Sequence, residues 1–293
     1  GGGVLLALNL AWILAPQAFG VPHANNVTPE QKTLPARLAF VSVAAWWLLF
    51  SIPILRRVKE PPRTMERDET TTGINLLVTP FRRMGETVRE LRTFKHAFLM
   101  LLAFLIYNDG IQTIIRMATA YGTELKIPSS ALTVAILIVQ FVGIPFAFLF
   151  GMLADRIGAK RSVFLGLLAY TAISVIGFYM KTARDFYVLA FLVGMVQGGT
   201  QALSRSLFAS LIPAHKSGEF FGFYSVFEKF ASIFGPLLFS ITIATTGSSR
   251  NAILGVIIFF AVGAAILARV NVEEGRQMAR DAERDLVRIN GGH

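Results

Sequence analysis

The chain has 293 residues, of which 54% are hydrophobic and only 16% charged, and its formal net charge is +10. A soluble globular domain usually has fewer apolar and more charged residues, so this composition favours a membrane protein. The chain has no cysteine, which excludes disulfides, thiolate metal sites and thiol catalysis. Its four histidines stand far apart along the chain, so no metal-site spacing occurs and no cofactor is expected.

Apolar stretches recur along the chain, and most approach the roughly 20 residues that an α-helix needs to cross a bilayer. Together with the turn signals between them, they predict an all-α polytopic membrane protein with roughly eight spans. The predicted spans cover residues 1–15, 34–55, 96–121, 130–150, 162–180, 186–211, 220–246 and 250–270. The chain begins inside an apolar run, with no basic leader before it, so we expect a missing first part rather than a signal peptide.

Basic residues are concentrated between residues 56 and 95, after the second predicted span. The positive-inside rule places such a loop in the cytoplasm, next to anionic lipid headgroups. Acidic residues are interleaved with the basic ones, which argues against a nucleic-acid partner. The sequence therefore predicts a multi-pass protein of the bacterial inner (plasma) membrane, with this loop and the C-terminus in the cytoplasm.

These elements divide the chain into four predicted regions. Residues 1–55 hold two spans, residues 56–95 form a cytoplasmic linker, residues 96–270 hold six spans, and residues 271–293 form a cytoplasmic tail. Apolar residues recur at helical spacing over residues 81–95, opposite charged ones. This pattern predicts an amphipathic helix that lies in the membrane interface.

A short basic segment punctuated by glycines, GMLADRIGAKR at Gly151–Arg161, separates two of the long apolar stretches. We expect Gly151 and Gly158 to allow tight backbone paths where one helix ends and the next begins. Asp155 is expected to cap or face the positive end of a neighbouring helix. The basic residues are expected to pair with carboxylates or lipid phosphates as a latch, and the alternative is a plain basic loop; they are Arg156, Lys160 and Arg161.

Six spans with such a segment after the second resemble one half of a major facilitator superfamily transporter. In that superfamily each half can carry a loop of the form G-x-L-A-D-R-x-G-x-K/R-R. The matching residues here are Gly151, Leu153, Ala154, Asp155, Arg156, Gly158, Lys160 and Arg161. Three strings further resemble the vacuole-effluxer-like branch of the superfamily: FLIYNDGIQTII at Phe104–Ile115, VQGGTQALSRSLFASLIP at Val196–Pro213 and EFFGFYSVFEKFASIFGPLLF at Glu219–Phe239.

The resemblance implies both a fold and a function. A complete member has about twelve spans in two six-span halves, so about eight of twelve are expected here: the last two of the first half and the complete second half. The missing N-terminal spans would then be a partner of this chain. The implied function is secondary active transport of a small polar solute by alternating access, and the characterised fungal members export amino acids from the vacuole. The alternative is a non-transporting membrane scaffold or sensor on the same fold.

An enzyme is the weakest function class for this chain. No Ser/His/Asp set, paired intramembrane carboxylates, metal cluster or phosphate-binding loop appears in the sequence. The sequence therefore predicts no catalytic residue and no metal site.

Asp109 falls about midway along the predicted span 96–121, where a charge is costly. Such residues usually handle a solute or a coupling ion such as a proton, and the alternative is a structural network between helices. Gln112 and Arg116 follow at i+3 and i+7, so Arg116 is a candidate internal partner for Asp109. Asn108, which adjoins Asp109, belongs to the same candidate substrate or coupling site.

The predicted span 186–211 carries a second polar face. Gln197, Gln201 and Arg205 recur at i, i+4 and i+8, and for the glutamines helix packing and solute contact remain equally open. Gly194 and Gly198 form a small-xxx-small pattern on another side, which predicts close packing against a neighbouring helix.

Arg205 and Glu228 are predicted to form an ion pair between adjacent spans. Each lies on the order of 10 Å from the same membrane face, at a rise of roughly 1.5 Å per residue. Lys229 is a competing partner in sequence, but neighbouring positions on a helix point apart. The pair is expected to be structural or gating rather than part of a substrate site.

Overall fold

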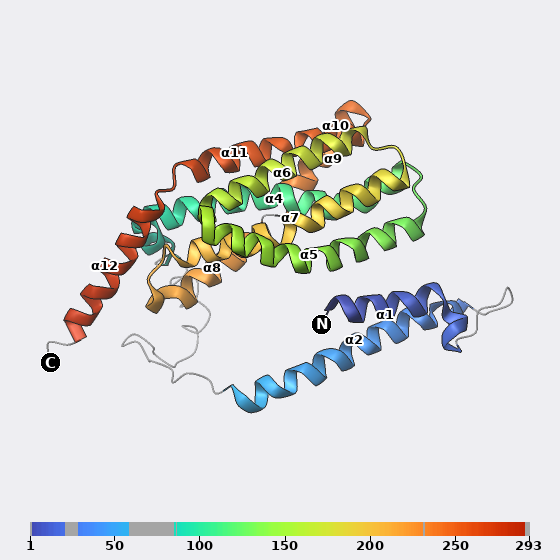
Figure 1. The fold of residues 1–293 in the computed structure, drawn as a ribbon, viewed down its shortest axis with the longest axis horizontal. Helices are drawn as coiled ribbons and strands as arrows, with labels where there is room; N and C mark the ends of the chain where they lie inside the picture. Colours follow the sequence, from blue (N-terminus) through green and yellow to red (C-terminus); the bar gives the residue numbers. More distant parts are fainter. Residues whose placement is uncertain (1, 21–28, 59–84, 86, 231, 291–293) are drawn as a thin grey trace. The chain divides into compact units, whose positions relative to one another are not determined.

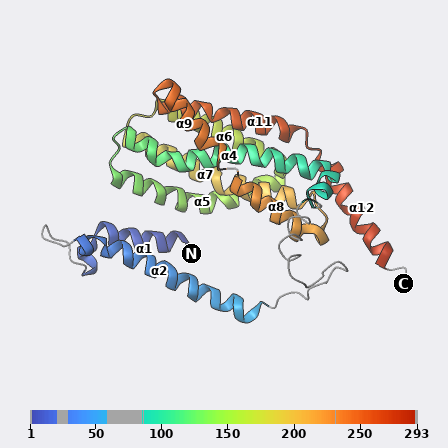
Figure 2. The ribbon, with the colours of Figure 1, turned by 180° about the vertical axis from the view of Figure 1, so that it is seen from behind.

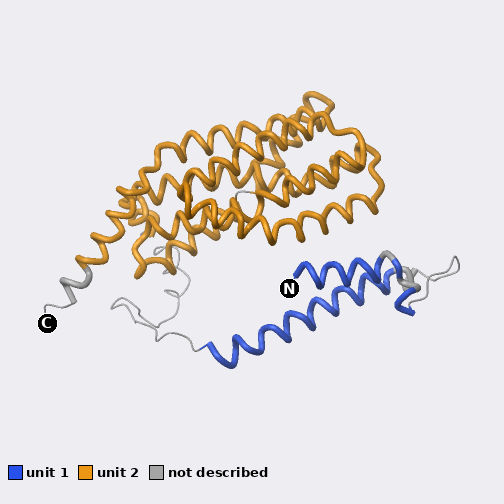
Figure 3. Tube along the Cα trace, viewed as in Figure 1, with its two compact units in different colours: residues 1–75 blue, residues 76–293 orange. Residues whose placement is uncertain are grey.

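The computed structural model describes residues 2–20, 29–58, 85, 87–230 and 232–290, without the side chains of residues 14, 16, 17, 29–32 and 286–290. Every regular element in these ranges is a helix. The chain divides into two compact units, Gly1–Asn75 and Leu76–His293 (Figure 3).

The predicted all-α polytopic fold is confirmed. Among the described residues, the helices long and apolar enough to cross a membrane are Thr33–Arg57, Lys95–Glu124, Ser129–Ile157, Ala159–Tyr179, Ala183–Ala209, Ala214–Thr246 and Ser249–Ala268. A shorter apolar helix, Gly2–Ile13, comes before them. Each predicted span coincides with one of these helices, and the largest difference is at the end of span 130–150, where the helix continues to Ile157.

The first unit consists of α1 (Gly2–Leu14), the short 3-10 helix η1 (Pro16–Phe19) and α2 (Pro29–Arg57) (Figure 1). Ser42 Oγ on α2 donates a hydrogen bond of 2.7 Å to Asn9 Oδ1 on α1. Asn9 is only 7% exposed, and a buried amide needs such a partner. This polar pair therefore fixes how two largely apolar helices align.

The second unit is a helix bundle followed by one further helix (Figures 1 and 2). Its elements are α4 (Lys95–Glu124), α5 (Ser129–Ile157), α6 (Ala159–Tyr179), α7 (Ala183–Ala209), η2 (Ala214–Lys216), α8 (Ser217–Phe230), α9 (Phe234–Thr246), α10 (Ser249–Gly255), α11 (Ile257–Ala268) and α12 (Val272–Asn290).

Helix α4 forms the centre of this bundle. It contacts α7, α8, α9, α11 and α12, and it also touches α5 and α6. Met100, Leu101, Tyr107 and Ile111 of α4 are all completely buried. A helix that is apolar on most sides buries most of its surface, so Asn108 and Asp109, at the middle of α4, are held inside the unit.

Helices α5 and α7 approach each other through glycines. A Cβ at Gly194 would lie 3.0 Å from Val142 Cβ, and one at Gly198 would lie 3.5 Å from the carbonyl oxygen of Gly143. The small-xxx-small contact predicted for Gly194 and Gly198 is therefore confirmed. Small residues allow the two backbones to come this close.

Two of the spans consist of two helices each instead of one. α8 ends at Phe230 and α9 begins at Phe234, while α10 and α11 meet at Val256. Gly235 and Pro236 stand in the first turn of α9. Proline is tolerated there because the first N–H groups of a helix have no partner within it.

The C-terminal helix α12 is anchored to the bundle. His96 Nδ1 at the start of α4 accepts a hydrogen bond of 3.1 Å from the backbone N–H of Asn271. Glu283 Oε1 accepts one of 2.7 Å from the backbone N–H of Ala214. A Cβ at Gly275 would lie 3.0 Å from His96 Cβ, so this glycine lets α12 lie close to α4.

Part of the predicted linker helix, residues 81–95, lies within the described residues. Residues 87–93 are helical, and Leu91 is 1% exposed as part of the bundle core. Glu90 Oε2 lies 3.1 Å from Lys216 Nζ, next to the start of α8. The described part of this helix therefore packs on the second unit, and the beginning of the prediction lies outside the described residues.

Candidate functional site

Asp109 caps a helix to which it does not belong. It lies in the middle of α4, is 1% exposed, and its Oδ1 accepts a 3.0 Å hydrogen bond from the backbone N–H of Gly235. Gly235 is in the first turn of α9, where the N–H groups lack partners within the helix and carry the positive end of its dipole. The α4 carboxylate therefore stabilises the start of α9, and α9 stabilises the carboxylate.

Glycine at position 235 allows this contact. A Cβ there would overlap Thr113 Oγ1 and would lie 3.0 Å from the backbone oxygen of Asp109. Thr113 Oγ1 itself donates a 2.7 Å hydrogen bond to that oxygen. Backbone therefore meets backbone where α4 and α9 cross, and any side chain at position 235 would force the helices apart.

Three polar atoms beside this contact lack a hydrogen-bond partner in the described part of the chain. Asp109 Oδ2 and both polar side-chain atoms of Asn108 are buried and form no hydrogen bond with any described residue. Buried polar atoms are nearly always paired in folded proteins. The centre of α4 thus carries more polar capacity than the packing of the helices uses.

The predicted pairing of Asp109 with Arg116 is wrong. Arg116 is exposed, and no ion pair joins it to Asp109 within the described ranges. Seven residues along a helix correspond to about 10 Å, whereas the N–H of Gly235 lies within hydrogen-bond distance. Gln112 is half-buried on α4 and forms no hydrogen bond to Asp109 in the described part of the chain.

The two glutamines of α7 have different surroundings. Gln197 lines a cavity, and its Oε1 is buried without a hydrogen-bond partner among the described residues. Gln201, one turn further along, is half-buried and does not line that cavity. The structure therefore separates the two glutamines that the sequence treats as one face.

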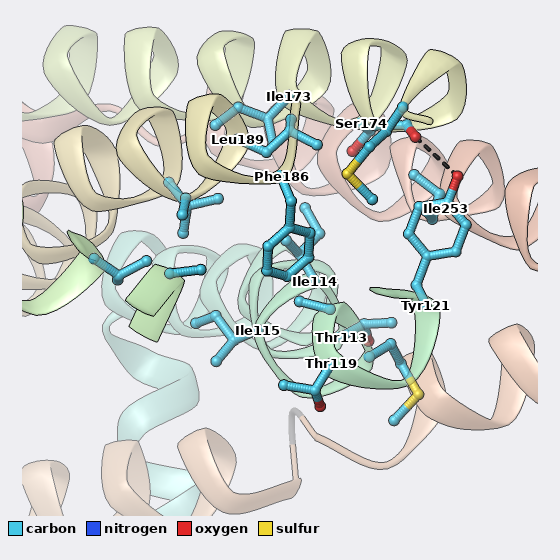
Figure 4. A pocket seen from close by; sticks show the side chains of 18 of the residues that line it. Thr113, Ile114, Ile115, Thr119, Tyr121, Ile173, Ser174, Phe186, Leu189 and Ile253 are labelled. Atoms are coloured by element: carbon cyan, nitrogen blue, oxygen red, sulfur yellow. Dashed lines mark hydrogen bonds between the residues drawn. The ribbon is translucent and has the colours of Figure 1, made fainter. Parts of the chain in front are cut away.

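The cavity has a volume of about 250 Å³ and is bounded by α4, α5, α6, α7, α9 and α10. Figure 4 shows Phe186 in its wall, between Leu189 and Ile114. Most of the lining is aliphatic or aromatic, and no charged side chain of the described residues lines it. The residues with polar side-chain atoms are Thr113, Thr119, Tyr121, Gln140, Ser174 and Gln197.

Arg205 and Glu228 join α7 to α8. Arg205 Nη2 lies 2.8 Å from Glu228 Oε1 and 2.7 Å from Oε2. The guanidinium carbon also lies 5.9 Å from the centre of the Tyr224 ring, within range of a cation–π contact. The side chain of Arg205 is 55% exposed and that of Glu228 is 24% exposed, so this pair stands at the surface of the unit.

The expectation for Gly151 is wrong, because α5 continues through it and ends only at Ile157. The turn is made by Gly158 alone, with a φ of 91°, a left-handed conformation that glycine adopts without strain. Asp155 is exposed in the last turn of α5 and caps no helix of the described residues. The dipole of α5 disfavours a carboxylate at its C-terminal end, so α5 itself does not stabilise the charge of Asp155.

Of the three basic residues in this segment, the structure gives a partner only to Lys160. Its Nζ donates hydrogen bonds of 3.0 Å to the backbone oxygen of Ala268 and 2.7 Å to that of Val270. Carbonyl oxygens at the end of a helix lack partners and carry its negative end. Lys160 therefore caps α11, while Arg156 and Arg161 are exposed and bind no carboxylate among the described residues.

The buried polar contact between α4 and α7 was not predicted from the sequence. The hydroxyls of Tyr107 on α4 and Ser204 on α7 lie 2.6 Å apart. Ser204 donates its only proton to the backbone oxygen of Thr200, so Tyr107 donates to Ser204. The recurrence of small hydroxyl residues at Thr200 and Ser204 was the only signal for it in the sequence.

The described residues hold no group of three or more His, Asp or Glu side chains that could bind a metal ion. His96 is engaged with the start of α12. The polar features of the second unit described above are thus helix caps, the Arg205–Glu228 and Glu90–Lys216 ion pairs, the Tyr107–Ser204 hydrogen bond and a largely apolar cavity.

Comparison with known proteins assigns the chain to a family. The family model described as "Vacuole effluxer Atg22 like" matches residues 1–280. The chain is 39% identical to the protein named "Uncharacterized MFS-type transporter YxiO" of Bacillus subtilis, over 96% of this chain and 62% of that protein. It is 29% identical to autophagy-related protein 22 of Yarrowia lipolytica, over 88% of this chain and 48% of that protein.

The chain spans about two-fifths to three-fifths of the length of the curated relatives that it matches. The match extends across both compact units and includes α4, α7 and the broken span α8–α9. The helical fold and the motif Gly151–Arg161 agree with it. This chain belongs to the vacuole effluxer Atg22-like family, a branch of the major facilitator superfamily of membrane transporters.

Proposed function

We propose that the chain is part of a secondary active transporter that moves a small polar solute by alternating access. The observation that carries this proposal is the buried Asp109 carboxylate at the first turn of α9, inside a broken span. In secondary transporters, interrupted membrane helices with their N-termini directed at anionic groups form substrate and coupling-ion sites. The family relationship supports transport, and amino-acid export remains part of the proposal.

Asp109 would act through α9 and not by touching the solute. It is 1% exposed and does not line the cavity. A proton on its carboxyl group would remove the negative charge that the start of α9 stabilises. The crossing of α4 and α9 would then have two states, which is what coupling of a proton to helix movement requires.

The arrangement of the complete transporter is also part of this proposal. Residues 1–55 would hold the last two spans of the first half, and residues 96–270 would form the six-span second half. The solute would cross between these halves, with Gln112, Arg116, Gln197 and Gln201 as the polar residues that could contact it. Asn108, which is 0% exposed, would contribute only from inside the second unit, as Asp109 does. Residues 56–95 and 271–293 would lie in the cytoplasm of a bacterial cell, as the positive-inside rule predicts.

The decisive experiment substitutes Asp109→Asn in the complete two-half protein. The amide oxygen of asparagine can still accept the hydrogen bond of Gly235 but cannot take up a proton, so we expect normal expression and no coupled flux. Flux would be measured in proteoliposomes under an imposed pH gradient, with candidate amino acids as solutes. Asp285→Asn, at an exposed position on α12, is the matched control and should transport normally.

Unchanged flux in Asp109→Asn would refute the coupling role of Asp109. If solutes stabilise the wild-type protein against heat but never cross the membrane, the protein would instead be a sensor. The cavity inside the second unit favours that second candidate, because a site within one unit can bind a molecule without passing it on.

A further inference from the structure

We propose that the cavity between α4, α5, α6, α7, α9 and α10 is a binding site for a neutral aromatic molecule with one hydrogen-bond donor. This inference does not depend on transport, because the cavity lies entirely within the second unit. It concerns a ligand class different from the polar solute proposed above.

The volume sets the size of the ligand. The cavity measures about 250 Å³. An apolar cavity of roughly 150 Å³ is known to stay dry and to hold benzene, and scaling by volume gives a ligand of about ten non-hydrogen atoms. This is the size of a two-ring aromatic molecule.

The lining excludes a charged ligand. No Asp, Glu, Lys, Arg or His of the described residues lines the cavity. An ammonium or carboxylate group placed there would lose its hydration without gaining a counter-charge, which strongly disfavours its binding. A zwitterionic amino acid therefore does not fit this cavity.

The hydroxyl groups in the lining are mostly used within the protein. Thr113 donates to the backbone oxygen of Asp109, Ser174 to that of Tyr170, and Tyr121 to that of Gly177. The Tyr121 hydroxyl and its bond are visible beside Ser174 in Figure 4. These side chains present little hydrogen-bonding capacity to a ligand.

Gln197 is different. Its Oε1 is buried and has no partner among the described residues. An acceptor that stays unpaired in an apolar wall is destabilising, and a ligand with a hydroxyl or N–H group would supply the missing hydrogen bond. One donor on the ligand is therefore matched by one acceptor in the wall.

The remaining lining favours an aromatic ring over an alkyl chain. Phe186, Phe239 and Tyr121 contribute ring surfaces, and Met117 and Met180 contribute thioethers. Aromatic pairs and sulfur–aromatic contacts are favourable beyond their buried area. Exposed lining residues on α4 and α5 mark the open side of the cavity, through which a ligand could enter; they are Thr119, Ile136 and Gln140.

The test uses the complete two-half protein in lipid nanodiscs, with naphthalene and 2-naphthol as probes. These molecules share one ring system and differ by a single hydroxyl group. Binding would be measured by equilibrium dialysis, with empty nanodiscs subtracted for partition into lipid. We expect saturable binding of both probes, 2-naphthol binding the more tightly. Partition without saturation would overturn the proposal.

Gln197→Leu keeps the volume of the side chain but removes its acceptor. We expect the affinity for 2-naphthol to fall about tenfold and that for naphthalene to stay the same or rise. Gln201→Leu is the matched control, since it makes the same change one turn along α7, outside the cavity lining, and should alter neither affinity. An equal loss of both probes in Gln197→Leu and Gln201→Leu would refute the role of Gln197.

Ala190→Phe tests the cavity itself. Ala190 is 8% exposed and lines the cavity, so a phenyl group there should fill the space and abolish binding of both probes. Val188→Phe, on the exposed side of the same helix, should bind both as the wild type does. L-tryptophan should not compete with 2-naphthol, because its charged groups cannot enter. If Ala190→Phe still binds the probes, or L-tryptophan competes, the site or its ligand class is wrong.

Discussion

The two halves of the broken span α8–α9 are each held by a contact with a carboxylate, and the two contacts differ in burial. In α9, the N–H of Gly235 bonds to Asp109, which is 1% exposed. In α8, Glu228 pairs with Arg205, whose side chain is 55% exposed. The same kind of interaction is thus made once inside the bundle and once at its surface.

The difference in burial determines how much each contact contributes to the stability of the fold. A buried acceptor or donor that loses its partner costs its full desolvation energy. An exposed ion pair exchanges its partner for solvent and contributes little. We therefore expect the Asp109 contact to fix α9 firmly to α4. The Arg205–Glu228 pair should add little to the buried ring contact between Phe208 and Tyr224, which also joins α7 to α8.

The largest effect should come from Gly235→Leu. Its Cβ would overlap Thr113 Oγ1, and its backbone neighbours on α4 cannot move aside. Overpacking against backbone should cost about 3 kcal/mol or more, seen as a large fall in apparent Tm in detergent. Gly222→Ala on α8, where a Cβ would meet nothing within 4 Å, should not lower Tm. A stable Gly235→Leu would show that α4 and α9 do not cross this closely.

The second effect separates the hydrogen bond of Asp109 from its charge. Asp109→Leu removes the acceptor of the Gly235 N–H and should destabilise the protein by about 1–3 kcal/mol. Asp109→Asn retains an acceptor and should remain closer to the wild type in thermal unfolding. If both variants unfold at the same temperature, the carboxylate does not cap α9.

Loss of the Lys160 side chain should have an intermediate effect on stability, because its ammonium group donates hydrogen bonds to two backbone carbonyls at the edge of the bundle. Lys160→Met keeps the aliphatic stem and should cost about 1–2 kcal/mol through the uncapped end of α11. The neighbouring Arg161→Met changes the same charge at an exposed position and should leave the unfolding temperature nearly unchanged. Equal shifts in the two variants would mean that net charge, and not the cap, matters.

The smallest effect is expected at the exposed pair. Arg205→Gln should cost less than about 1 kcal/mol, because the pair lies at the surface of the unit and the glutamine amide can still donate a hydrogen bond to Glu228. Reversing one charge, as in Arg205→Glu, should lower expression, and adding Glu228→Arg should restore it. A cost for Arg205→Gln that matches Asp109→Leu would show that burial does not separate the two contacts. Failure of the double reversal would show that the two side chains do not act as a pair.

Much of this molecule could be predicted from the order of its residues. Hydrophobic length located the spans, because crossing a bilayer is a property of one continuous segment. The depth of Arg205 and Glu228 in two adjacent spans predicted their contact, since the position of each residue is counted from the same membrane face. Gly194 and Gly198 predicted a close helix contact for the same local reason.

The partners of the buried groups could not be predicted in this way. The sequence paired Asp109 with Arg116 on its own helix, but the carboxylate meets the start of α9, more than a hundred residues later. It predicted that Lys160 pairs with carboxylates or lipid phosphates, but the ammonium group caps α11. In both cases the partner is a backbone group at the end of a helix. The pattern of side chains in the sequence does not show which helix end will lie next to a given residue.

The sequence by itself therefore determined the helical membrane fold, the family and the places where polar residues enter the bundle. Hydrophobicity, residue spacing and a sequence motif are local properties, so they can be recognised without knowing which helices contact one another. Only the tertiary structure decided which helix end faces Asp109, which glutamine lines the cavity and where α5 ends relative to Gly151. Those outcomes depend on how closely backbones approach, and that distance is set by the packing of all the helices together.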